Sequence, residues 1–182
     1  MNLQLESMAI EMPAVAGHPN RVGFRGVLTL VDVPSDRPPA GARGHRVVLT
    51  KAAAEIALPS LLGMGVGYSL ALDRHDVRRK AGVITQAEIT GRQLELSGYL
   101  FAKDFPDVVK EVGHGTPHSR AGMMCAGGMA NDALGMSYEI ADARVADLRA
   151  SVWVLTQVTF TGAAILRRSK AAYRATWIEL MK

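Results

Sequence analysis

Hydrophobic and polar residues alternate most regularly in two neighbouring runs, at 82–90 and 93–101, which Gly91 and Arg92 separate. Alternation with a period of two places every second side chain on one face of a β-strand, and a two-residue connection containing Gly suits a tight turn. The pattern therefore predicts an antiparallel hairpin. Further runs rich in β-branched and apolar residues predict three more strands, at 21–31, 133–140 and 149–160.

Helical patterns are shorter than the strand patterns. Thr50 precedes an Ala-rich stretch that stops at Pro59, and a Thr hydroxyl can cap the first turn of a helix. A second helix is expected at 104–112, with Pro106 in its first turn, where proline is tolerated. The stretch 169–181 is also helical in character, which predicts a helix near the end of the chain.

Three segments are dominated by Gly or Pro. The segment 34–41 reads as a loop, because Pro fixes φ and removes hydrogen-bond donors. The segment 60–72 contains a Gly-x-Gly-x-Gly run, but it lacks the preceding strand and following helix that a nucleotide-binding loop needs. Six Gly or Pro residues in 113–130 indicate a lid, a flexible loop or a stretch that a partner orders.

Length and composition fit one domain with a sizeable core, since the chain has 182 residues of which 48% are hydrophobic. We expect an N-terminal extension over 1–20 and one domain over 21–182. The single cysteine, Cys125, excludes an intrachain disulfide and a multi-cysteine zinc site, and we predict no cofactor and no metal. Neither a secretory signal nor an apolar run long enough for a transmembrane helix is expected, so we predict no membrane partner.

Charge adds little to this picture. The formal net charge is +4, and the basic residues are dispersed apart from clusters at 78–80 and 167–170. Nucleic-acid binders usually concentrate such residues on one face, so we interpret each cluster as solvated surface. A nucleic-acid-binding module would rest on net charge alone and is not favoured.

Ser137 and His75 carry the most informative chemistry. Ser137 lies between small residues in an expected strand, and His75 lies in a charged turn 62 positions earlier. A Ser hydroxyl is a weak nucleophile unless a base lies within hydrogen-bond reach, and residues so far apart meet only if the fold brings them together. A surface histidine and a structural serine are the alternative interpretation.

The order of elements and motifs resembles the prohead (capsid maturation) serine proteases of tailed phages, which share their fold with the herpesvirus assemblins. The similarity covers roughly residues 20–175. It depends on the order of five moderate motifs: Phe24-x-Gly26, His75-Asp76 followed by Gly82, the strand Gln93 to Gly98, Leu134 to Tyr138, and Leu155 to Thr159. The resemblance implies an α+β fold, a mostly antiparallel β-barrel-like core with flanking helices.

The resemblance also implies roles for particular residues. It makes Ser137 the nucleophile and His75 the base that takes its proton. It further places Arg167 and Arg168 where an arginine pair helps to hold the oxyanion in the assemblins; an exposed basic turn is the alternative.

The third catalytic position is where this chain departs from the family pattern. The matching residue is Gln157, where many phage relatives have a glutamate and the assemblins use a second histidine. An amide in place of such a carboxylate costs about four decades of rate in the Ser-His-Asp template. Either Asp76, Asp142 or Asp147 supplies the acid instead, or the enzyme is slow or inactive.

Two functions follow from the resemblance. The first is a serine endopeptidase that cleaves scaffold and possibly also major capsid protein inside an immature viral shell, in the host cytoplasm. The second is a catalytically inactive homologue that serves as a structural or scaffold component of the procapsid, which Gln157 would favour. Assembly of several copies of the chain is compatible with both functions.

Overall fold

The computed structural model describes residues 7–9, 17–114 and 133–181. These residues form nine strands in one sheet and two α-helices, α1 (Lys51–Ala57) and α2 (Pro106–His114), with a short 3₁₀ helix after α1 at Leu58–Leu61. The strands are β1 (Ser7–Ala9), β2 (Val22–Leu30), β3 (Arg46–Leu49), β4 (Gly65–Tyr68), β5 (Lys80–Thr90), β6 (Gln93–Leu100), β7 (Leu134–Val145), β8 (Val152–Arg167) and β9 (Trp177–Leu180).

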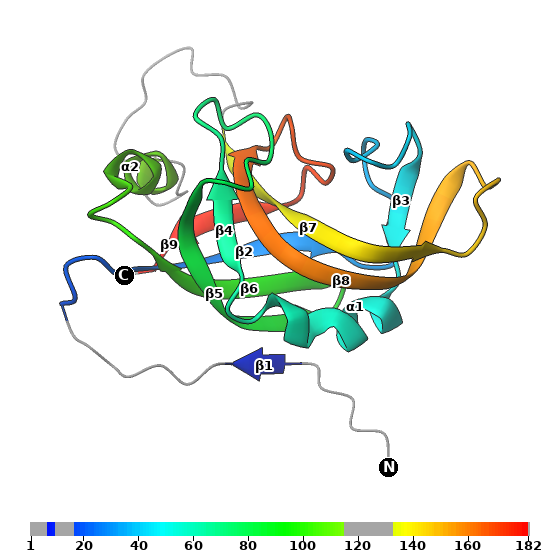
Figure 1. Ribbon diagram of the computed structural model, residues 1–182, viewed down its shortest axis with the longest axis horizontal. Helices are drawn as coiled ribbons and strands as arrows, with labels where there is room; N and C mark the ends of the chain where they lie inside the picture. Colours follow the sequence, from blue (N-terminus) through cyan, green and yellow to red (C-terminus); the bar gives the residue numbers. More distant parts are fainter. Residues whose placement is uncertain (1–6, 10–16, 115–132, 182) are drawn as a thin grey trace.

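The sheet is mostly antiparallel and curls into a half-barrel (Figure 1). Its order is β3-β8-β4-β5-β6-β2-β9, with β7 paired to β8 and β1 paired to β5. The long strand β8 joins most of these parts, because β7 pairs along one edge while β3 and β4 pair in parallel with its other edge. This arrangement confirms the expected α+β fold with a mostly antiparallel, barrel-like core.

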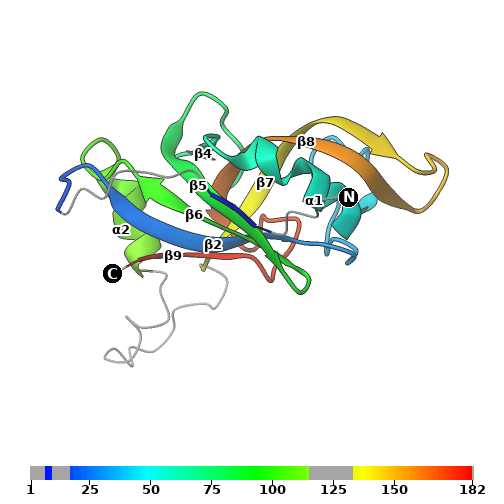
Figure 2. The same ribbon diagram turned by 90° about the horizontal axis from the view of Figure 1, so that it is seen from below.

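The curl brings β7 across β2, as the two ribbon views show (Figures 1 and 2). Met136 of β7 is 1% exposed, and its sulfur lies over Gly26 of β2, where a Cβ atom would be 2.9 Å away. A side chain at position 26 would therefore separate the two strands. The close approach of β7 and β2 closes the core and leaves β7 beside a cleft.

Helix α1 covers the gap that β3 and β4 leave along β8. Its Ala53 and Ala54 are buried, and Ser60 in the following turn accepts a hydrogen bond from the backbone N–H of Phe160 at 2.8 Å. Thr50 caps the helix as predicted, because its hydroxyl oxygen accepts a hydrogen bond from Ala53 N at 3.2 Å.

The predicted hairpin is confirmed, with Thr90 opposite Gln93 and Gly91 at a φ of 61°. The predicted helix at 104–112 corresponds to α2. The strands around Ser137 and after residue 149 both run further than predicted, as β7 and β8. The segment 113–130, expected to be a lid, a flexible loop or a stretch that a partner orders, lies outside the described residues from 115 to 130, as does Cys125.

The prediction of a C-terminal helix is wrong. Residues 177–180 instead form β9, which pairs antiparallel with β2 from Phe24 opposite Leu180 to Val27 opposite Trp177. The edge of β2 offers backbone partners, and pairing there buries Ile178 to 4% exposure. Tertiary contacts of this kind override a local helix propensity worth a few tenths of a kcal/mol per residue.

Two further observations concern the ends of the chain and its helices. Residues 7–9, inside the expected N-terminal extension, add β1 to the sheet through the pairing of Ser7 with Glu88. Neither helix in the described part of the chain has the length and apolar character needed to cross a membrane.

Candidate functional site

The loop that carries His75 connects β4 to β5 and is held at two points. Ser69 is buried, and its hydroxyl donates to the Asp73 carboxylate at 2.8 Å while accepting from Asp73 N at 3.1 Å. Leu72 is also buried, and its carbonyl accepts a hydrogen bond from Arg167 N at the end of β8. These contacts place His75 beside β7.

Ser137 and Glu139 lie on the same face of β7. Ser137 is opposite Ala164 and Glu139 is opposite Gly162 in β8, with no register shift between the two pairs. Side chains two residues apart on a strand point the same way. The Glu139 carboxylate reaches His75, with 3.3 Å between Oε1 and the ring nitrogen Nδ1. One strand face therefore carries the candidate nucleophile and a carboxylate that contacts the candidate base.

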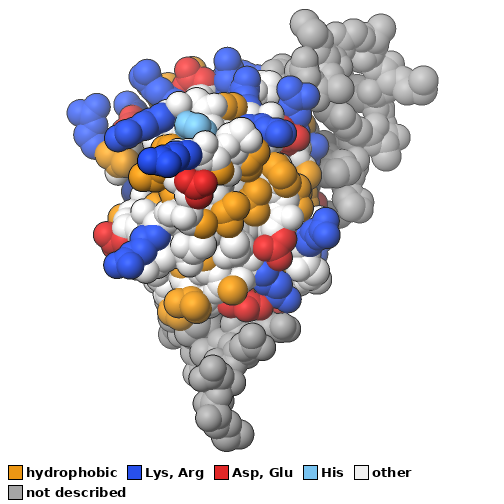
Figure 3. Space-filling view, turned by 90° about the vertical axis from the view of Figure 1, so that its right-hand side faces the viewer, with side chains coloured by type: hydrophobic (Ala, Val, Ile, Leu, Met, Phe, Trp, Pro, Cys, Tyr) orange, Lys and Arg blue, Asp and Glu red, His pale blue; other side chains and the backbone are white. Residues whose placement is uncertain are grey.

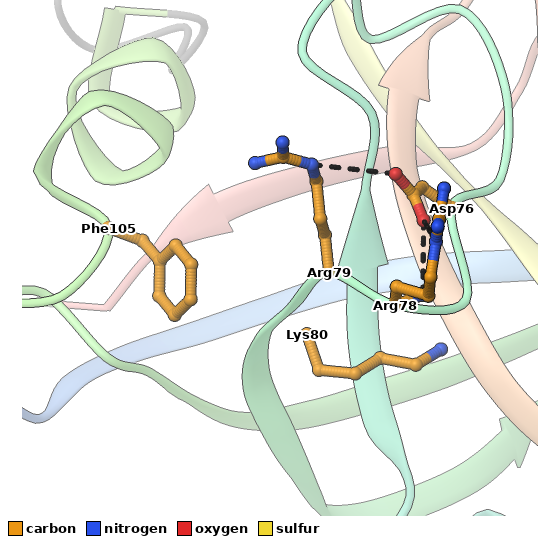
Figure 4. A pocket seen from close by; sticks show the side chains of 5 residues that line it. All are labelled: Asp76, Arg78, Arg79, Lys80 and Phe105. Atoms are coloured by element: carbon orange, nitrogen blue, oxygen red, sulfur yellow. Dashed lines mark hydrogen bonds and ion pairs between the residues drawn. The ribbon is translucent and has the colours of Figure 1, made fainter.

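Lys80 contacts the other carboxylate oxygen of Glu139, with 2.9 Å between Nζ and Oε2. Figure 4 shows its side chain extending from β5 across β4, away from Arg79. Glycines make room for it, because a Cβ at Gly65 would lie 2.8 Å from Lys80 Cδ and one at Gly162 would lie 2.7 Å from Glu139 Oε2. The lysine stem also borders a hollow of about 640 Å³, which is lined by Asp76, Arg78, Arg79, Lys80 and Phe105.

The contacts with Lys80 and His75 keep Glu139 ionised. Burial by itself would raise the pKa of this carboxyl, whose side chain is 12% exposed, but hydrogen bonds from His75 and Lys80 and the charge of both partners lower the pKa below its ordinary value. A carboxylate that stays charged at Nδ1 favours a proton on that nitrogen. The second ring nitrogen, Nε2, is then the one that carries the lone pair.

A cleft of about 910 Å³ contains His75, Ser137 and Glu139 in its wall. Part of its lining is apolar and comes from the turn between β7 and β8 and from its flanks: Val145, Leu148, Trp153 and Leu155. Figure 3 views the end of the molecule where β3 and this turn lie, and hydrophobic side chains gather there between Lys and Arg. The cleft therefore joins a polar centre to an apolar surface.

The structure brings both main predicted residues, His75 and Ser137, into this cleft. It forms no hydrogen bond between them among the bonds of the described residues, in which His75 bonds through Nδ1 to Glu139. In free enzymes, catalytic hydrogen bonds are commonly long and tighten when the substrate binds. The arrangement provides a hydroxyl, an imidazole and a carboxylate in the wall of one cleft.

Gln157, the expected third position, is not brought to His75. It lies opposite Arg144 and is exposed, five residues along β8 from Gly162, which is about 16 Å at the rise of a β-strand. β8 extends further along the chain than the predicted strand. The motif that contains Gln157 lies in the first half of β8, whereas Ser137 and Glu139 pair with residues of its second half. Glu139 occupies the place beside His75 instead.

None of the three alternative acids forms a hydrogen bond or ion pair with His75 among those of the described residues. The carboxylate of Asp76 accepts a hydrogen bond from Arg78 N and pairs with Arg79 at 3.4 Å. Asp147 accepts from Arg149 N, and Asp142 is exposed at a φ of 52°.

The predicted oxyanion pair lies at the end of β8. The backbone N–H of Arg167 donates to Leu72 O at 2.8 Å, and that of Arg168 donates to Ala133 O at 2.9 Å, so neither backbone donor points to a substrate here. Arg167 is opposite Leu134, three residues before Ser137. Their observed backbone contacts connect β8 to the loop of His75 and to the start of β7.

Sequence reasoning missed Glu139 and Lys80. One signal could have found Glu139: it follows Ser137 by two positions in an expected strand, which places both side chains on one face. Lys80 gave no such signal, since it belongs to a basic cluster interpreted as solvated surface. Within 7–9, 17–114 and 133–181, no group of three or more His, Cys, Asp or Glu side chains is placed to hold a metal ion.

Comparisons with known proteins support the fold. No protein-family model matches the chain, and no curated protein matches it by sequence. Among solved structures, the chain is similar to the protease of the herpesvirus KSHV in complex with a hexapeptide phosphonate inhibitor, with a TM-score of 0.52 and 11% sequence identity. The similarity covers 88% of this chain, which spans 65% of the length of that protease. The assemblin-like fold is confirmed, while the similarity to prohead proteases has no sequence match behind it.

Proposed function

We propose that the protein is a serine endopeptidase in which Ser137 is the nucleophile, His75 the general base and Glu139 the acid that orients the imidazole. The observation that carries the proposal is the contact of Glu139 with His75 Nδ1, on the same strand face as Ser137 and in one cleft. A carboxylate at Nδ1 leaves Nε2 to serve the hydroxyl, which is the division of roles in the Ser-His-Asp template. The herpesvirus protease fold supports the same reaction class.

In the proposed reaction, Ser137 Oγ attacks the carbonyl carbon of the scissile peptide bond while its proton passes to His75 Nε2. The resulting imidazolium is stabilised by the Glu139 carboxylate at Nδ1. The tetrahedral intermediate then collapses, the C–N bond breaks, and Nε2 returns the proton to the leaving amine. A water molecule attacks the acyl-enzyme in the same way, giving up a proton to Nε2, which restores it to Ser137.

The proposed substrates are scaffold and major capsid protein of a viral procapsid in the host cytoplasm, and this part rests on the resemblance of the motifs. The cleft supports an extended peptide as substrate, because about 910 Å³ can hold several residues and its lining is partly apolar. The apolar side chains near the β7–β8 turn would contact hydrophobic substrate residues.

The alternative of a catalytically inactive homologue no longer has Gln157 in its favour. Gln157 would disable the site only if it were the residue behind His75, and Glu139 makes that contact instead. A structural role in the procapsid is therefore the outcome that the experiment must distinguish, without a specific observation in its favour.

Labelling with a fluorophosphonate, a reagent that reacts with activated serines, tests the proposal. The protein should be labelled at Ser137, as located by peptide mass spectrometry, and Ser137→Ala should abolish the label. Glu139→Gln should slow labelling by up to about four decades, by analogy with the same change in the template triad. Gln157→Ala is the matched control and should react at the wild-type rate, because its side chain is exposed at the far part of β8.

Cleavage of purified scaffold protein provides the second readout. Absence of both Ser137 labelling and scaffold cleavage, in a protein that still joins procapsids, would replace the protease proposal with the structural one. Equal labelling rates in Glu139→Gln and wild type would remove Glu139 from the catalytic group.

A further inference from the structure

We propose that Lys80 is a positioning residue of this site: its ammonium group holds one oxygen of the Glu139 carboxylate so that the other oxygen faces Nδ1 of His75. The catalytic meaning of this inference rests on the proposed function, whereas the positioning itself is a property of the folded chain. Lys80 contacts neither Ser137 nor His75 among the hydrogen bonds and ion pairs of the described residues, so it acts through Glu139.

The Glu139 carboxylate bridges two partners with its two oxygens. Oε2 lies 2.9 Å from Lys80 Nζ, and Oε1 lies 3.3 Å from His75 Nδ1. The last torsion of a glutamate side chain is broad and roughly two-fold, so one partner alone holds it loosely. The shorter, charge-assisted bond to Lys80 therefore fixes the rotation that the longer bond to His75 depends on.

Two glycines, Gly65 and Gly162, shape the space for this contact, and a third, Gly67, lies within van der Waals reach of it. A Cβ atom would lie 2.8 Å from Lys80 Cδ at Gly65, 3.4 Å from Lys80 Nζ at Gly67, and 2.7 Å from Glu139 Oε2 at Gly162. These glycines come from β4 and β8, the two strands that lie between the start of β5 and Glu139 in the pairing order. Gly65, the middle glycine of the Gly-x-Gly-x-Gly run, thus leaves room for a lysine side chain.

The neighbouring cations behave differently from Lys80. Arg78 and Arg79 both pair with Asp76, and the side chain of Arg78 is 90% exposed. In Figure 4 a dashed line joins Arg79 to Asp76, whereas the side chain of Lys80 extends below them and is joined to neither. Of these three basic residues, Lys80 is the one whose charge reaches the site, and its side chain is 31% exposed.

Fixing the carboxylate has a defined chemical consequence. A charged oxygen held at Nδ1 selects the imidazole tautomer with its proton on Nδ1, and the lone pair then lies on Nε2. Free neutral histidine prefers the opposite tautomer, so the preference at His75 reports directly on the position of Glu139. The wrong tautomer is the reason why an amide in the template triad is so damaging.

Long-range ¹H–¹⁵N spectra of ¹⁵N-histidine-labelled protein, recorded where histidine is neutral, test the inference. His75→Gln assigns the signals. Wild type should show His75 as the Nδ1–H form, and Lys80→Met, which keeps the length of the stem, should shift it towards Nε2–H. Arg78→Met removes a nearby charge without touching Glu139 and should leave the tautomer unchanged. An unchanged Nδ1–H form in a folded Lys80→Met protein would overturn the proposal.

A second measurement keeps the test decisive if Lys80→Met fails to fold. This measurement keeps Lys80 and follows the chemical shift of its ¹⁵Nζ signal. The shift should differ between wild type and Glu139→Gln, and it should be the same in wild type and Gln157→Ala. An unchanged shift in Glu139→Gln would overturn the inference.

Labelling separates this inference from the proposed function. Lys80→Met should lower the rate of Ser137 labelling roughly 10- to 100-fold, the range expected when a reacting group is misplaced by about 1 Å. If wild type is not labelled while the tautomer still depends on Lys80, the protease proposal fails and the positioning role stands.

Discussion

Gly162→Ala is expected to weaken the site through a single added methyl group. The new Cβ would lie 2.7 Å from Glu139 Oε2 and 3.1 Å from the carbonyl oxygen of Gly65. Non-bonded heavy atoms reach their optimal separation near 3.5 Å, so Oε2 must retreat by about 0.8 Å. The end of a glutamate side chain can move that far, whereas the β4 backbone cannot move as easily.

Both oxygens belong to one planar carboxylate, so a retreat of Oε2 also displaces Oε1, and a shift of this size is enough to break the contact of Oε1 with His75. The Nδ1 to Oε1 distance is already 3.3 Å, at the long end for a hydrogen bond. A charge-assisted hydrogen bond contributes about 1.5–3 kcal/mol when buried. His75 and Glu139 are partly exposed, at 29% and 12%, so we expect a loss of roughly 1 kcal/mol in the free energy of unfolding. Labelling of Ser137 should fall by about 10- to 100-fold.

Urea unfolding and fluorophosphonate labelling measure the two effects. Gly113→Ala is the matched control, because Gly113 lies in α2 and its Cβ would meet Leu180 Cδ1 of β9 at an ordinary 3.5 Å. That variant should label like wild type and keep or gain up to about 1 kcal/mol, as alanine is the better helix former. A Gly162→Ala protein with wild-type stability and labelling would refute the argument that space around Glu139 is limiting.

Two further predictions concern ionisation and an unpaired hydroxyl. The lowered pKa of Glu139 means that this carboxylate stabilises the folded state fully above the ordinary glutamate value of 4.5 and loses that contribution as the pH falls through the lowered value. The difference in urea midpoint between wild type and Glu139→Gln should therefore be largest near pH 7 and shrink below about pH 4.5; a difference that grows in acid would contradict this sign. The Tyr138 hydroxyl is buried with no hydrogen-bond partner among the described residues, and burial raises its pKa far above the ordinary range. Tyr138→Phe should raise the free energy of unfolding by about 1 kcal/mol by removing this group, and a loss of similar size would show that the hydroxyl has a partner.

The strand pattern of the central fold could be read from the sequence because its signals are local. Alternation with a period of two identified the hairpin of β5 and β6, and the hydroxyl of Thr50 identified the start of α1. The C-terminal strand gave no comparable signal. Residues 177–180 form β9 because β2 offers an edge about 150 positions away in the chain, and that pairing outweighs local propensity.

The same division holds for the site. The sequence by itself identified Ser137 and His75 as candidates, whereas Glu139 was missed although its two-residue spacing from Ser137 puts both side chains on one face of a strand. The sequence could not show that β8 carries Gln157 away from His75, since that depends on the register between β7 and β8. Nor could it separate Lys80 from its basic neighbours. The tertiary structure decided this, because two glycines on two other strands, Gly65 and Gly162, leave the space through which one lysine reaches a carboxylate 59 positions away.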